Sequence, residues 1–534
     1  MYSANHASRA VGATNRLKDD VCPISGLCVT CVETCVGLCE VGLSAIRGPE
    51  VIYPIPFGNV TAASQKDYPV HWGHFNILGT AVGAHGVQAD SEHAIFPKVN
   101  IEVKLGAKKG KPGIASRLPI TIPGLGSTDI ARKSWPSLAA GAALSGVILT
   151  VGENVVGMDE EATIKNGRVV NSPALAARVA QYKEWSDGQY GTVVIQENVE
   201  DNRLGVLEYA IKELGVVAVE MKWGQGAKDI GGEVKIDRLS KAKMLRERGY
   251  IVLPDPLDAA VAQAFERKAF REFERHSRLG MVSEEGFAKR ADSLRKAGAQ
   301  YLFLKTGAYR FADLARAVAY CSKYGVDVLT IDAAGGGTGM SPWRMMNEWG
   351  TPAIETFTKA WQYTKRLADA GKHVPDLVFA GGFTMEDHIF KGLALGAPFV
   401  KAIGMARGPL TACTASNALW YRIGGETDQK LVERFGRTKE EVFYGAISLM
   451  PKLGDKRFDK LPAGGLGVYT YLARVDQGLR QLMAGARKFV LDDPKARPDR
   501  NDLVALTPDA AAVSGLPTVC DHDQDEAERI LSSV

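Results

Sequence analysis

The stretch from Val374 to Gly408, VPDLVFAGGFTMEDHIFKGLALGAPFVKAIGMARG, decides the fold. It holds one apolar run that ends on Gly381 and Gly382, then a helical segment, then a second apolar run that ends on Gly404. Glycine at a strand end lets backbone N–H groups approach a ligand, and a group of such donors suits a phosphate. The last two strands of a (β/α)8 barrel carry its usual phosphate site. We therefore expect a phosphate cradle here, and ordinary strand-to-helix turns are the alternative.

The pattern around this stretch predicts an α/β fold, a (β/α)8 TIM barrel. Short apolar runs alternate with amphipathic segments from about Leu118 onward, as in repeated βα units around a parallel sheet. Eight runs qualify as strands, the number that closes a barrel: residues 118–123, 147–151, 191–196, 216–221, 300–305, 326–332, 376–380 and 398–403. Helices are expected between them, for example over 130–144, 203–214, 311–324 and 354–370.

The remaining segments are predicted to flank or interrupt the barrel. Residues 1–117 form an N-terminal Cys-rich region, 118–420 the barrel, and 421–534 a C-terminal helical extension that ends beyond Leu491 in a loosely ordered polar tail. The interval after the fourth strand is too long for one helix. We expect an insertion there, with a charged helix over 257–278.

Composition restricts the class of partner. The chain has 534 residues, of which 46% are hydrophobic and 24% charged, as in ordinary globular proteins. A formal charge of +4 without a basic stripe argues against nucleic acid. No run approaches the ~18 apolar residues that span a bilayer, and the N-terminus lacks the apolar core of a secretory signal. We expect no membrane partner and a cytoplasmic location.

Five of the eight cysteines fall close together, at Cys22, Cys28, Cys31, Cys35 and Cys39. In a reducing compartment such clustering favours a metal over disulfides. Four thiolates could hold an iron–sulfur cluster of undetermined type, which is the leading interpretation. A zinc site is the second, and a small apolar helix that packs through cysteines is the third.

Histidines also concentrate near the N-terminal side of the barrel. His71, His74, His85 and His93 lie with Asp90 in a short interval, although the whole chain has only nine histidines. Nothing else in this interval resembles a known ligand arrangement. We interpret these histidines as surface and packing residues.

Barrel chemistry belongs to the carboxyl ends of the strands, so the residues that follow each strand are the candidate site. The candidate catalytic residues are Glu153, Lys222 and Lys305. The candidate cofactor-binding residues are Gly124, Gly126, Ser127, Gln225, Lys305, Gly336, Gly337, Gly339, Gly381, Gly382, Gly404 and Met405. A glycine-lined mouth that bears lysines above a phosphate cradle fits FMN, with a lysine stabilising the anionic reduced ring.

Several of these segments resemble a known family. GENVVG, MKWGQGAKDIGG, GGGTGMSP and AGGFTMEDHIFKGLALGAPFVKAIGMA are similar, in order and spacing, to the FMN-binding barrel domain of glutamate synthase, over roughly Leu118 to Asn417. The resemblance implies that 2-iminoglutarate, formed from 2-oxoglutarate and ammonia, is reduced by hydride transfer from FMN, with an iron–sulfur cluster relaying electrons. It also implies that Glu153 is the family's acidic residue after strand two and Lys305 its lysine after strand five. Lys222 and Gln225 match the strand-four signature.

The sequence also departs from that family. Met1 and Tyr2 offer no N-terminal cysteine nucleophile, so we expect no glutamine hydrolysis. Cys413 stands alone where the family has a three-cysteine loop, and Gly335 and Ala380 replace acidic residues. The alternatives are therefore a related flavoenzyme on another imino or 2-oxo acid, a non-catalytic FMN and iron–sulfur electron-transfer subunit, and a flavin-free barrel that binds a phosphorylated metabolite. The expected partners are an NAD(P)H-oxidising or ferredoxin-type electron donor and further copies of the chain in an oligomer.

Overall fold

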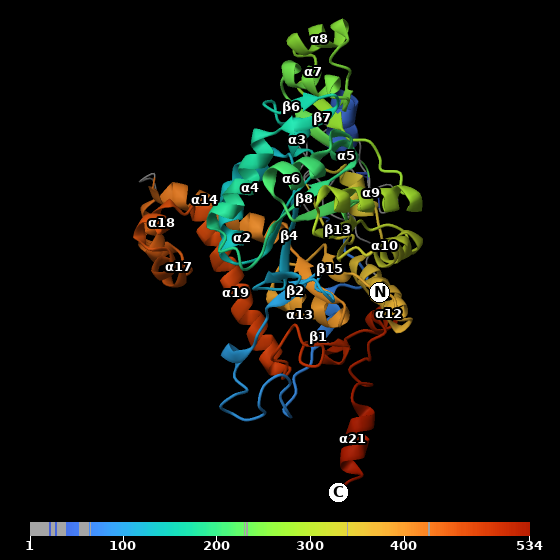
Figure 1. Cartoon of the computed structure of the whole chain (residues 1–534), viewed down its shortest axis with the longest axis vertical. Helices are drawn as coiled ribbons and strands as arrows, with labels where there is room; N and C mark the ends of the chain where they lie inside the picture. Colours follow the sequence, from blue (N-terminus) through green and yellow to red (C-terminus); the bar gives the residue numbers. More distant parts are fainter. Residues whose placement is uncertain are drawn as a thin grey trace.

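Eight parallel strands close into a barrel at the centre of the molecule (Figure 1). The computed structural model describes residues 21–22, 27–28, 39–52, 64, 66–228, 230, 233–338, 340–424 and 428–534. Strand order around the barrel follows chain order, and the last strand pairs with the first. The strands are β4 (Ile120–Leu125), β5 (Ile148–Val151), β8 (Val193–Glu197), β9 (Ala218–Lys222), β13 (Tyr301–Thr306), β14 (Val328–Asp332), β15 (Asp376–Ala380) and β16 (Val400–Gly404). The predicted barrel is confirmed, and no predicted strand end differs from the observed one by more than two residues.

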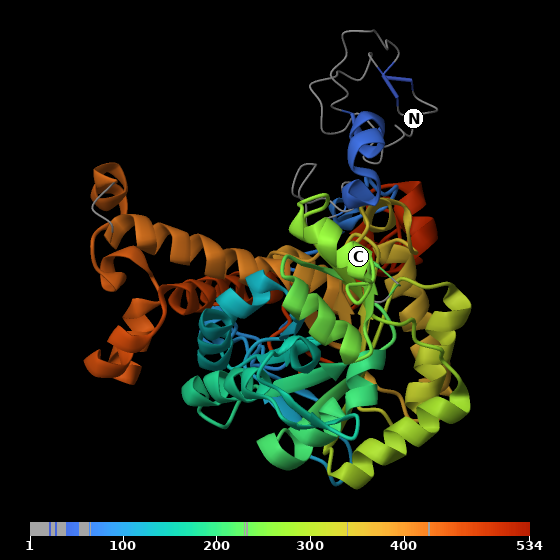
Figure 2. The ribbon, with the colours of Figure 1, turned by 90° about the horizontal axis from the view of Figure 1, so that it is seen from above.

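Helices surround the barrel (Figure 2). The outer ring contains α2 (Asp129–Leu144), α4 (Pro173–Trp185), α6 (Val206–Leu214), α9 (Glu284–Ala297), α10 (Phe311–Lys323), α12 (Ala353–Asp369) and α13 (Glu386–Leu395). Shorter elements are α3 (Val155–Met158), α5 (Val199–Leu204), α11 (Trp343–Glu348) and the β6 (Thr163–Lys165) to β7 (Arg168–Asn171) hairpin. The helix predicted over 203–214 divides at Gly205, whose φ of 70° is left-handed and ends α5 before α6 begins.

The insertion after β9 forms a small subdomain at one end of the barrel (Figure 1). Its antiparallel sheet has the order β10 (Glu233–Ile236), β12 (Phe273–His276), β11 (Ile251–Leu253), and it carries α7 (Leu239–Glu247) and α8 (Ala259–Glu266). The predicted helix over 257–278 is wrong in its second half, because β12 occupies residues 273–276. Phe273 is fully buried in the core of the subdomain, and pairing on both edges of the strand overrides the helix-like charge pattern.

The C-terminal extension begins with α14 (Arg407–Gly424) and returns along the barrel in α19 (Ala463–Gly485). Between them, α15 (Gln429–Phe435), α16 (Lys439–Val442), α17 (Ala446–Leu453) and α18 (Asp455–Lys460) project to one side as a helical arm (Figure 2). The loosely ordered tail predicted beyond Leu491 is wrong up to α20 (Pro508–Ser514). Buried Arg497 donates hydrogen bonds to the carbonyl oxygens of Pro398 and Val400, which anchors this segment beneath the barrel.

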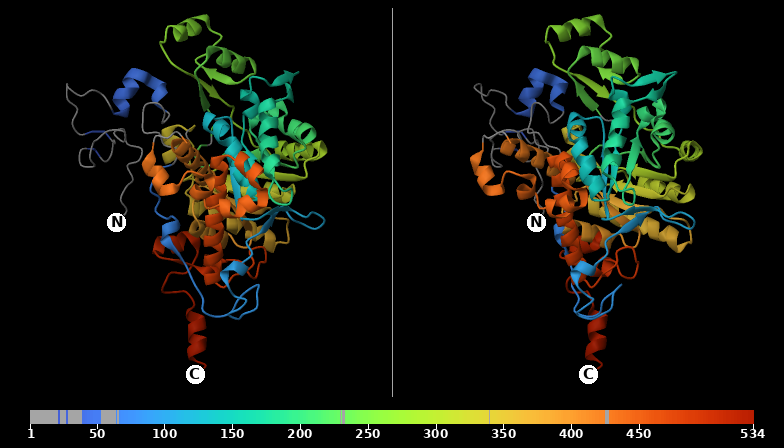
Figure 3. Two further views of the ribbon diagram at one scale, coloured as in Figure 1. Left: turned by 90° about the vertical axis from the view of Figure 1, so that its left-hand side faces the viewer. Right: turned by 60° about the vertical axis from the view of Figure 1, so that its left-hand side comes forward.

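Residues 66–117, which precede the barrel, pack on its outside and on its amino end. After α1 (Glu40–Arg47), η2 (Gly48–Ile52) and η3 (Trp72–His74), the strand β1 (Phe75–Ile77) pairs with β17 (Leu503–Ala505), which follows η5 (Arg500–Asp502). After η4 (Phe96–Lys98), the hairpin β2 (Val103–Leu105) and β3 (Ile114–Ser116) lies at the amino end, where the Gly106 N–H donates to Asp376 Oδ2 at 2.6 Å. None of the described helices combines the length and apolar character that crossing a membrane demands. The last helix, α21 (Gln524–Leu531), stands apart from the body (Figure 3).

Candidate active site

The carboxyl ends of the barrel strands bring two lysine–carboxylate pairs to one mouth. Lys222, at the end of β9, donates from Nζ to Glu153 Oε1 at 2.6 Å and to Gln225 Oε1 at 2.7 Å. Its neighbour on β13 is Lys305, whose Nζ lies 2.8 Å from Asp332 Oδ2. The three residues that the sequence singles out as catalytic therefore lie at the same end of the barrel, on neighbouring strands and loops.

Charge pairing fixes the protonation states of this group. Burial raises the pKa of Glu153, but the charge of Lys222 and its hydrogen bond outweigh burial, so the pKa falls to about 2. Burial lowers the pKa of Lys305, yet the charges of Asp332 and Glu220 raise it above its ordinary value. At neutral pH, Glu153 is a carboxylate and Lys305 an ammonium. Glu153 in this state accepts hydrogen bonds and attracts a cation, and it has no proton to donate.

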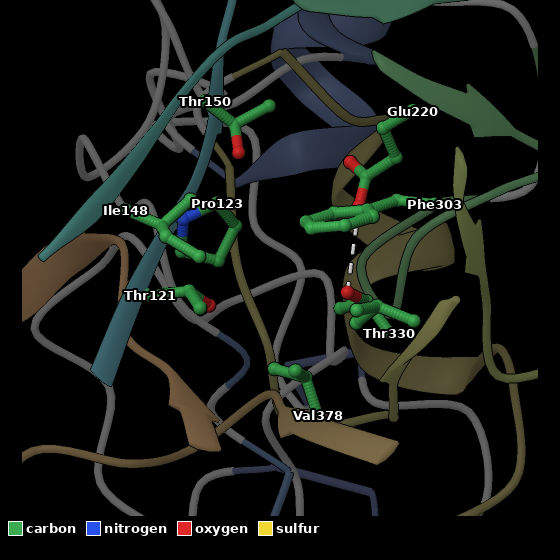
Figure 4. Close-up of a pocket in the computed structure, with 9 residues that line it drawn as sticks. Thr121, Pro123, Ile148, Thr150, Glu220, Phe303, Thr330 and Val378 are labelled. Carbon is green, nitrogen blue, oxygen red and sulfur yellow. Dashed lines mark hydrogen bonds between the residues drawn. The ribbon is translucent and has the colours of Figure 1, made fainter. Parts of the chain in front are cut away.

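A buried glutamate that the sequence analysis did not single out lies deeper in the barrel. Glu220 Oε1 accepts a hydrogen bond from Gln196 Nε2 at 2.5 Å, and Oε2 accepts one from Thr330 Oγ1 at 3.4 Å (Figure 4). Burial raises the pKa of Glu220, and the nearby charge of Lys305 offsets only part of this rise. The signal in the sequence is a single carboxylate inside the apolar run VVAVEM.

The side chain of Glu220 faces a small cavity in the barrel interior (Figure 4). The cavity has a volume of about 10 Å³, close to the lower limit for one water molecule. Its lining residues are Thr121, Pro123, Ile148, Thr150, Glu220, Phe303, Val328, Thr330 and Val378. The described part of the barrel below the mouth is therefore a core packed closely around this small cavity.

The turns after β15 and β16 lie side by side, because Ala380 and Gly404 are partners in the parallel ladder. Gly381 has a φ of 101°, and a Cβ there would lie 2.5 Å from the Ala333 carbonyl oxygen. Gly382 has a φ of 90°, with no atom within 4 Å of a built Cβ. Among the described residues, no acceptor takes a hydrogen bond from the backbone N–H of Gly382 or of Phe383. This turn is thus an open group of amide donors.

The first turn of α14 completes this donor group. The N–H groups of Ala406 and Arg407 form no hydrogen bond to a described residue, and a helix N-terminus favours an anion. Arg407 is partly buried, and burial lowers the pKa of its guanidinium while the charge of Asp332 opposes this shift. The N–H of Met405 differs, since it donates to Thr121 O at 2.9 Å. The sequence analysis missed Arg407, and a cation three residues after Gly404 was the available signal.

The predicted residues at the end of β4 and directly after it pack closely against neighbouring segments. A Cβ on Gly126 would lie 2.5 Å from the Glu153 carbonyl oxygen, and one on Gly124 would lie 2.8 Å from Gln196 Oε1. Ser127 Oγ accepts a hydrogen bond from Arg275 Nη2 at 3.5 Å. These residues let the β4 loop approach the β5 loop and the insertion closely, which holds Glu153 in place.

Two quoted motifs, KWGQGAK and GGGTGMSP, pack on each other. A Cβ on Gly226 would lie 1.9 Å from the Ala333 carbonyl oxygen, so only glycine fits there. Lys228 Nζ donates to Met340 O at 2.9 Å, and Ser341 Oγ donates to Ala227 O at 2.8 Å. Gly336 and Gly337 lie in this loop after Asp332, whereas Gly339 is outside the described residues.

Comparison with known proteins agrees with this geometry. Residues 275–419 match a family model described as the conserved region in glutamate synthase. This part of the chain is similar to the conserved region of glutamate synthase. It contains Lys305, Asp332, the Gly381–Gly382 turn and Arg407, so the resemblance predicted from the sequence is confirmed over this range. No curated protein matches the chain.

The solved structures that resemble this chain have low sequence identity to it. A soluble mutant of (S)-mandelate dehydrogenase from Pseudomonas putida is 14% identical, covers 81% of this chain and 88% of its own, and has a TM-score of 0.41. An IMP dehydrogenase/GMP reductase-like protein from Corynebacterium glutamicum is 11% identical, covers 83% and 94%, and has a TM-score of 0.39. The barrel assignment rests on the strand pairing described above.

The matched range, residues 275–419, includes Cys413, the residue compared with the cysteine loop of the resembling family. Here Cys413 is fully buried in α14, and its Sγ donates to Ser134 O at 3.7 Å. Burial raises the pKa of the thiol, so a thiolate is disfavoured. Cys413 therefore packs between α14 and α2.

The clustered cysteines lie outside the matched range of residues 275–419. Cys22 donates from its backbone N–H to Leu27 O at 2.8 Å, and Val21 forms an isolated β-bridge with Cys28. Cys39 caps α1, where its Sγ accepts from the Gly42 N–H at 3.5 Å. Cys31 and Cys35 are outside the described residues. Within the described part of the chain no group of three or more potential ligands is placed to hold a metal, and the iron–sulfur cluster stays a prediction.

Proposed function

We propose that this protein is an FMN-dependent oxidoreductase that transfers hydride to an imino or 2-oxo acid. The simplest such reaction is the reductive amination of 2-oxoglutarate with ammonia to give glutamate. One observation carries the proposal: the open amide donors of the Gly381–Gly382 turn share one barrel mouth with the buried Lys305 ammonium. The match to the conserved region in glutamate synthase supports it.

The residues at the mouth fit FMN. The Gly382 and Phe383 amides, the first turn of α14 and the Arg407 guanidinium would hold the phosphate, because they present donors and positive charge to one space. Lys305 would lie at the electron-rich edge of the ring, where an ammonium stabilises negative charge. FMN, when bound, supplies a carrier that accepts and donates hydride.

The second ion pair at the mouth suits an imino acid. Glu153 is ionised, so it would accept a hydrogen bond from a protonated imine nitrogen and orient it. Lys222 holds Glu153 in place and would offer its positive charge to the carboxylate of a 2-oxo acid. A substrate with a protonated imine and a carboxylate would thus place its imine nitrogen on Glu153 and its carboxylate on Lys222.

Electrons would reach the barrel through the clustered N-terminal cysteines, with a ferredoxin-type or NAD(P)H-oxidising protein as donor. The support is the spacing of these five cysteines in the sequence. A second candidate function is the same chemistry on a different imino or 2-oxo acid. Gly335 and Ala380 favour it, because they stand where the resembling family has acidic residues.

The test is anaerobic purification followed by a visible spectrum and a turnover assay. We expect flavin absorption near ~450 nm with a broad iron–sulfur shoulder. Adding 2-oxoglutarate and ammonia to the chemically reduced protein should reoxidise the flavin and form glutamate. A colourless protein that binds no added FMN would overturn the proposal. Reoxidation by a different 2-oxo acid alone would replace the first candidate with the second.

A further inference from the structure

The last helix, α21, has an apolar stripe that no described residue covers. α21 spans Gln524–Leu531, and every residue from 523 to 534 is exposed. Ala527, Ile530, Leu531 and Val534 recur at helical spacing, with Ile530 56% and Leu531 68% exposed. A helix of eight residues is marginal in water without packing. We therefore expect the apolar stripe of α21 to pack against a partner surface.

The surroundings of the stripe are acidic. Residues 521–531, DHDQDEAERIL, contain five carboxylates against one arginine, Arg529, which pairs with Glu526. On a helical projection Glu526 and Glu528 flank the apolar stripe on its two sides. A complementary surface would thus be an apolar strip with basic residues along its edges.

The helical arm carries such a surface on α17 and on the turn before it, which we call the α17 face. Tyr444 is 68% exposed and Ile447 69% exposed, and Pro451 lies one turn further along the same exposed face. Lys452 and Lys456 are exposed beside them. Residues 429–460 hold eight Lys and Arg residues against five Asp and Glu residues, so the arm is basic where α21 is acidic.

The two surfaces do not meet within one chain. In Figures 1 and 3 α21 extends from the amino end of the barrel, whereas the arm projects sideways beyond α19. Thr518 is held by its bridge to Ala505, so only residues 519–523 link it to α21. Five extended residues reach about 18 Å, which gives α21 little freedom to cross the molecule.

We propose that α21 of one copy docks on the α17 face of a second copy of this chain, formed by Tyr444, Ile447 and Pro451. If each copy donates its helix to the other, the result is a closed dimer with two identical contacts. Each contact is small, so the dimer dissociates on dilution. This inference is independent of the proposed reaction.

Sedimentation velocity of the full chain over a range of concentrations tests the dimer. We expect a concentration-dependent shift from monomer to dimer. Ile530→Asp and Ile447→Asp should each weaken dimerisation at least tenfold, and since both side chains are exposed, folding should not change. Met281→Asp is the matched control, because Met281 is 92% exposed on a different surface. A wild-type chain that stays monomeric at all concentrations would overturn the proposal.

Charge reversal identifies the contact itself. Glu526→Lys with Glu528→Lys should weaken the dimer, and so should Lys452→Glu with Lys456→Glu. All four changes in one chain should restore it, since each reversed surface then meets a reversed partner. A dimer that persists in both double variants, or that the combined variant fails to restore, would show that another surface joins the copies.

Discussion

Lys305 and Asp332 project from adjacent strands β13 and β14 and join through a contact of 2.8 Å between Nζ and Oδ2. Their side chains are only 5% and 14% exposed, so each charge depends on the other for its solvation. The pair also fixes Lys305 as a cation at the mouth. A substitution in this pair should therefore change both the stability of the barrel and the chemistry that we propose at its mouth.

Breaking this pair should destabilise the fold. Lys305→Met leaves the Asp332 carboxylate without its cation, and we expect the free energy of unfolding to fall by about 3 kcal/mol. Lys305→Met with Asp332→Asn should recover part of that loss, because no unpaired charge remains. Urea denaturation of the wild type, both single variants and the double variant measures the coupling. Equal losses in the Lys305→Met variant and in the double variant would contradict it.

The Glu153–Lys222 pair should give an acid-dependent contribution to stability. The folded pKa of Glu153 is about 2, below its usual value of 4.5, so the ionised form is favoured by folding. This contribution is complete above pH 4.5 and is lost as the pH falls toward 2. Glu153→Gln should be destabilised at pH 7, and its difference from the wild type should shrink below pH 4.5. Unfolding curves at pH 7 and at pH 3.5 to 4 make the comparison, and a constant difference would refute the pairing.

The raised pKa of Asp201 should give stability the opposite pH dependence to that from Glu153. Burial raises its pKa from 3.8 to about 7, and its Oδ1 has no hydrogen-bond partner among the described residues. Between these values the folded state holds a proton that the unfolded state has released, so wild-type stability falls as pH rises. Asp201→Asn removes this dependence. We expect its stability, relative to the wild type, to improve from pH 4 to pH 7 in urea titrations.

Gly382 offers a test of the phosphate cradle. Gly382→Ala meets no neighbouring atom but strains a φ of 90°, and Gly371→Ala places the same strain at the end of α12, with a φ of 68° and no neighbour. Both should cost about 1 kcal/mol of stability. Only Gly382→Ala should weaken FMN binding, because Gly382 lies in the turn with open amide donors at the mouth and Gly371 does not. Fluorescence titration of FMN-free protein and thermal unfolding separate the two effects.

Arg407 should recognise the phosphate rather than the ring. Arg407→Gln should raise the Kd for FMN about tenfold, or ~1.4 kcal/mol, while the Kd for riboflavin stays unchanged. Titrating both ligands against the wild type and the variant provides the measurement. A parallel loss for both ligands would mean that Arg407 supports the fold of the mouth instead.

The sequence determined the barrel and the general place of its site. Short apolar runs that alternate with amphipathic segments located every barrel strand, and strand ends in a closed barrel must meet at one mouth, so Glu153, Lys222 and Lys305 could be grouped from the sequence. Local signals sufficed because each of these strands is buried on both faces. The charged stretch at Phe273 was expected to be helical, but strand pairing with β10 and β11 decides its structure. The polar stretch around Arg497 was expected to be loosely ordered, but hydrogen bonds to Pro398 and Val400 anchor it.

Only the tertiary structure decided which charges pair. Nothing in the sequence says that Lys305 joins Asp332 while Lys222 joins Glu153, or that Glu220 turns into the barrel. Arg407 likewise joins the cradle only because β16 closes the barrel beside β15. Strand order and apolar periodicity are local properties of a chain, whereas the pKa of a buried group depends on charges that the fold brings within a few ångströms.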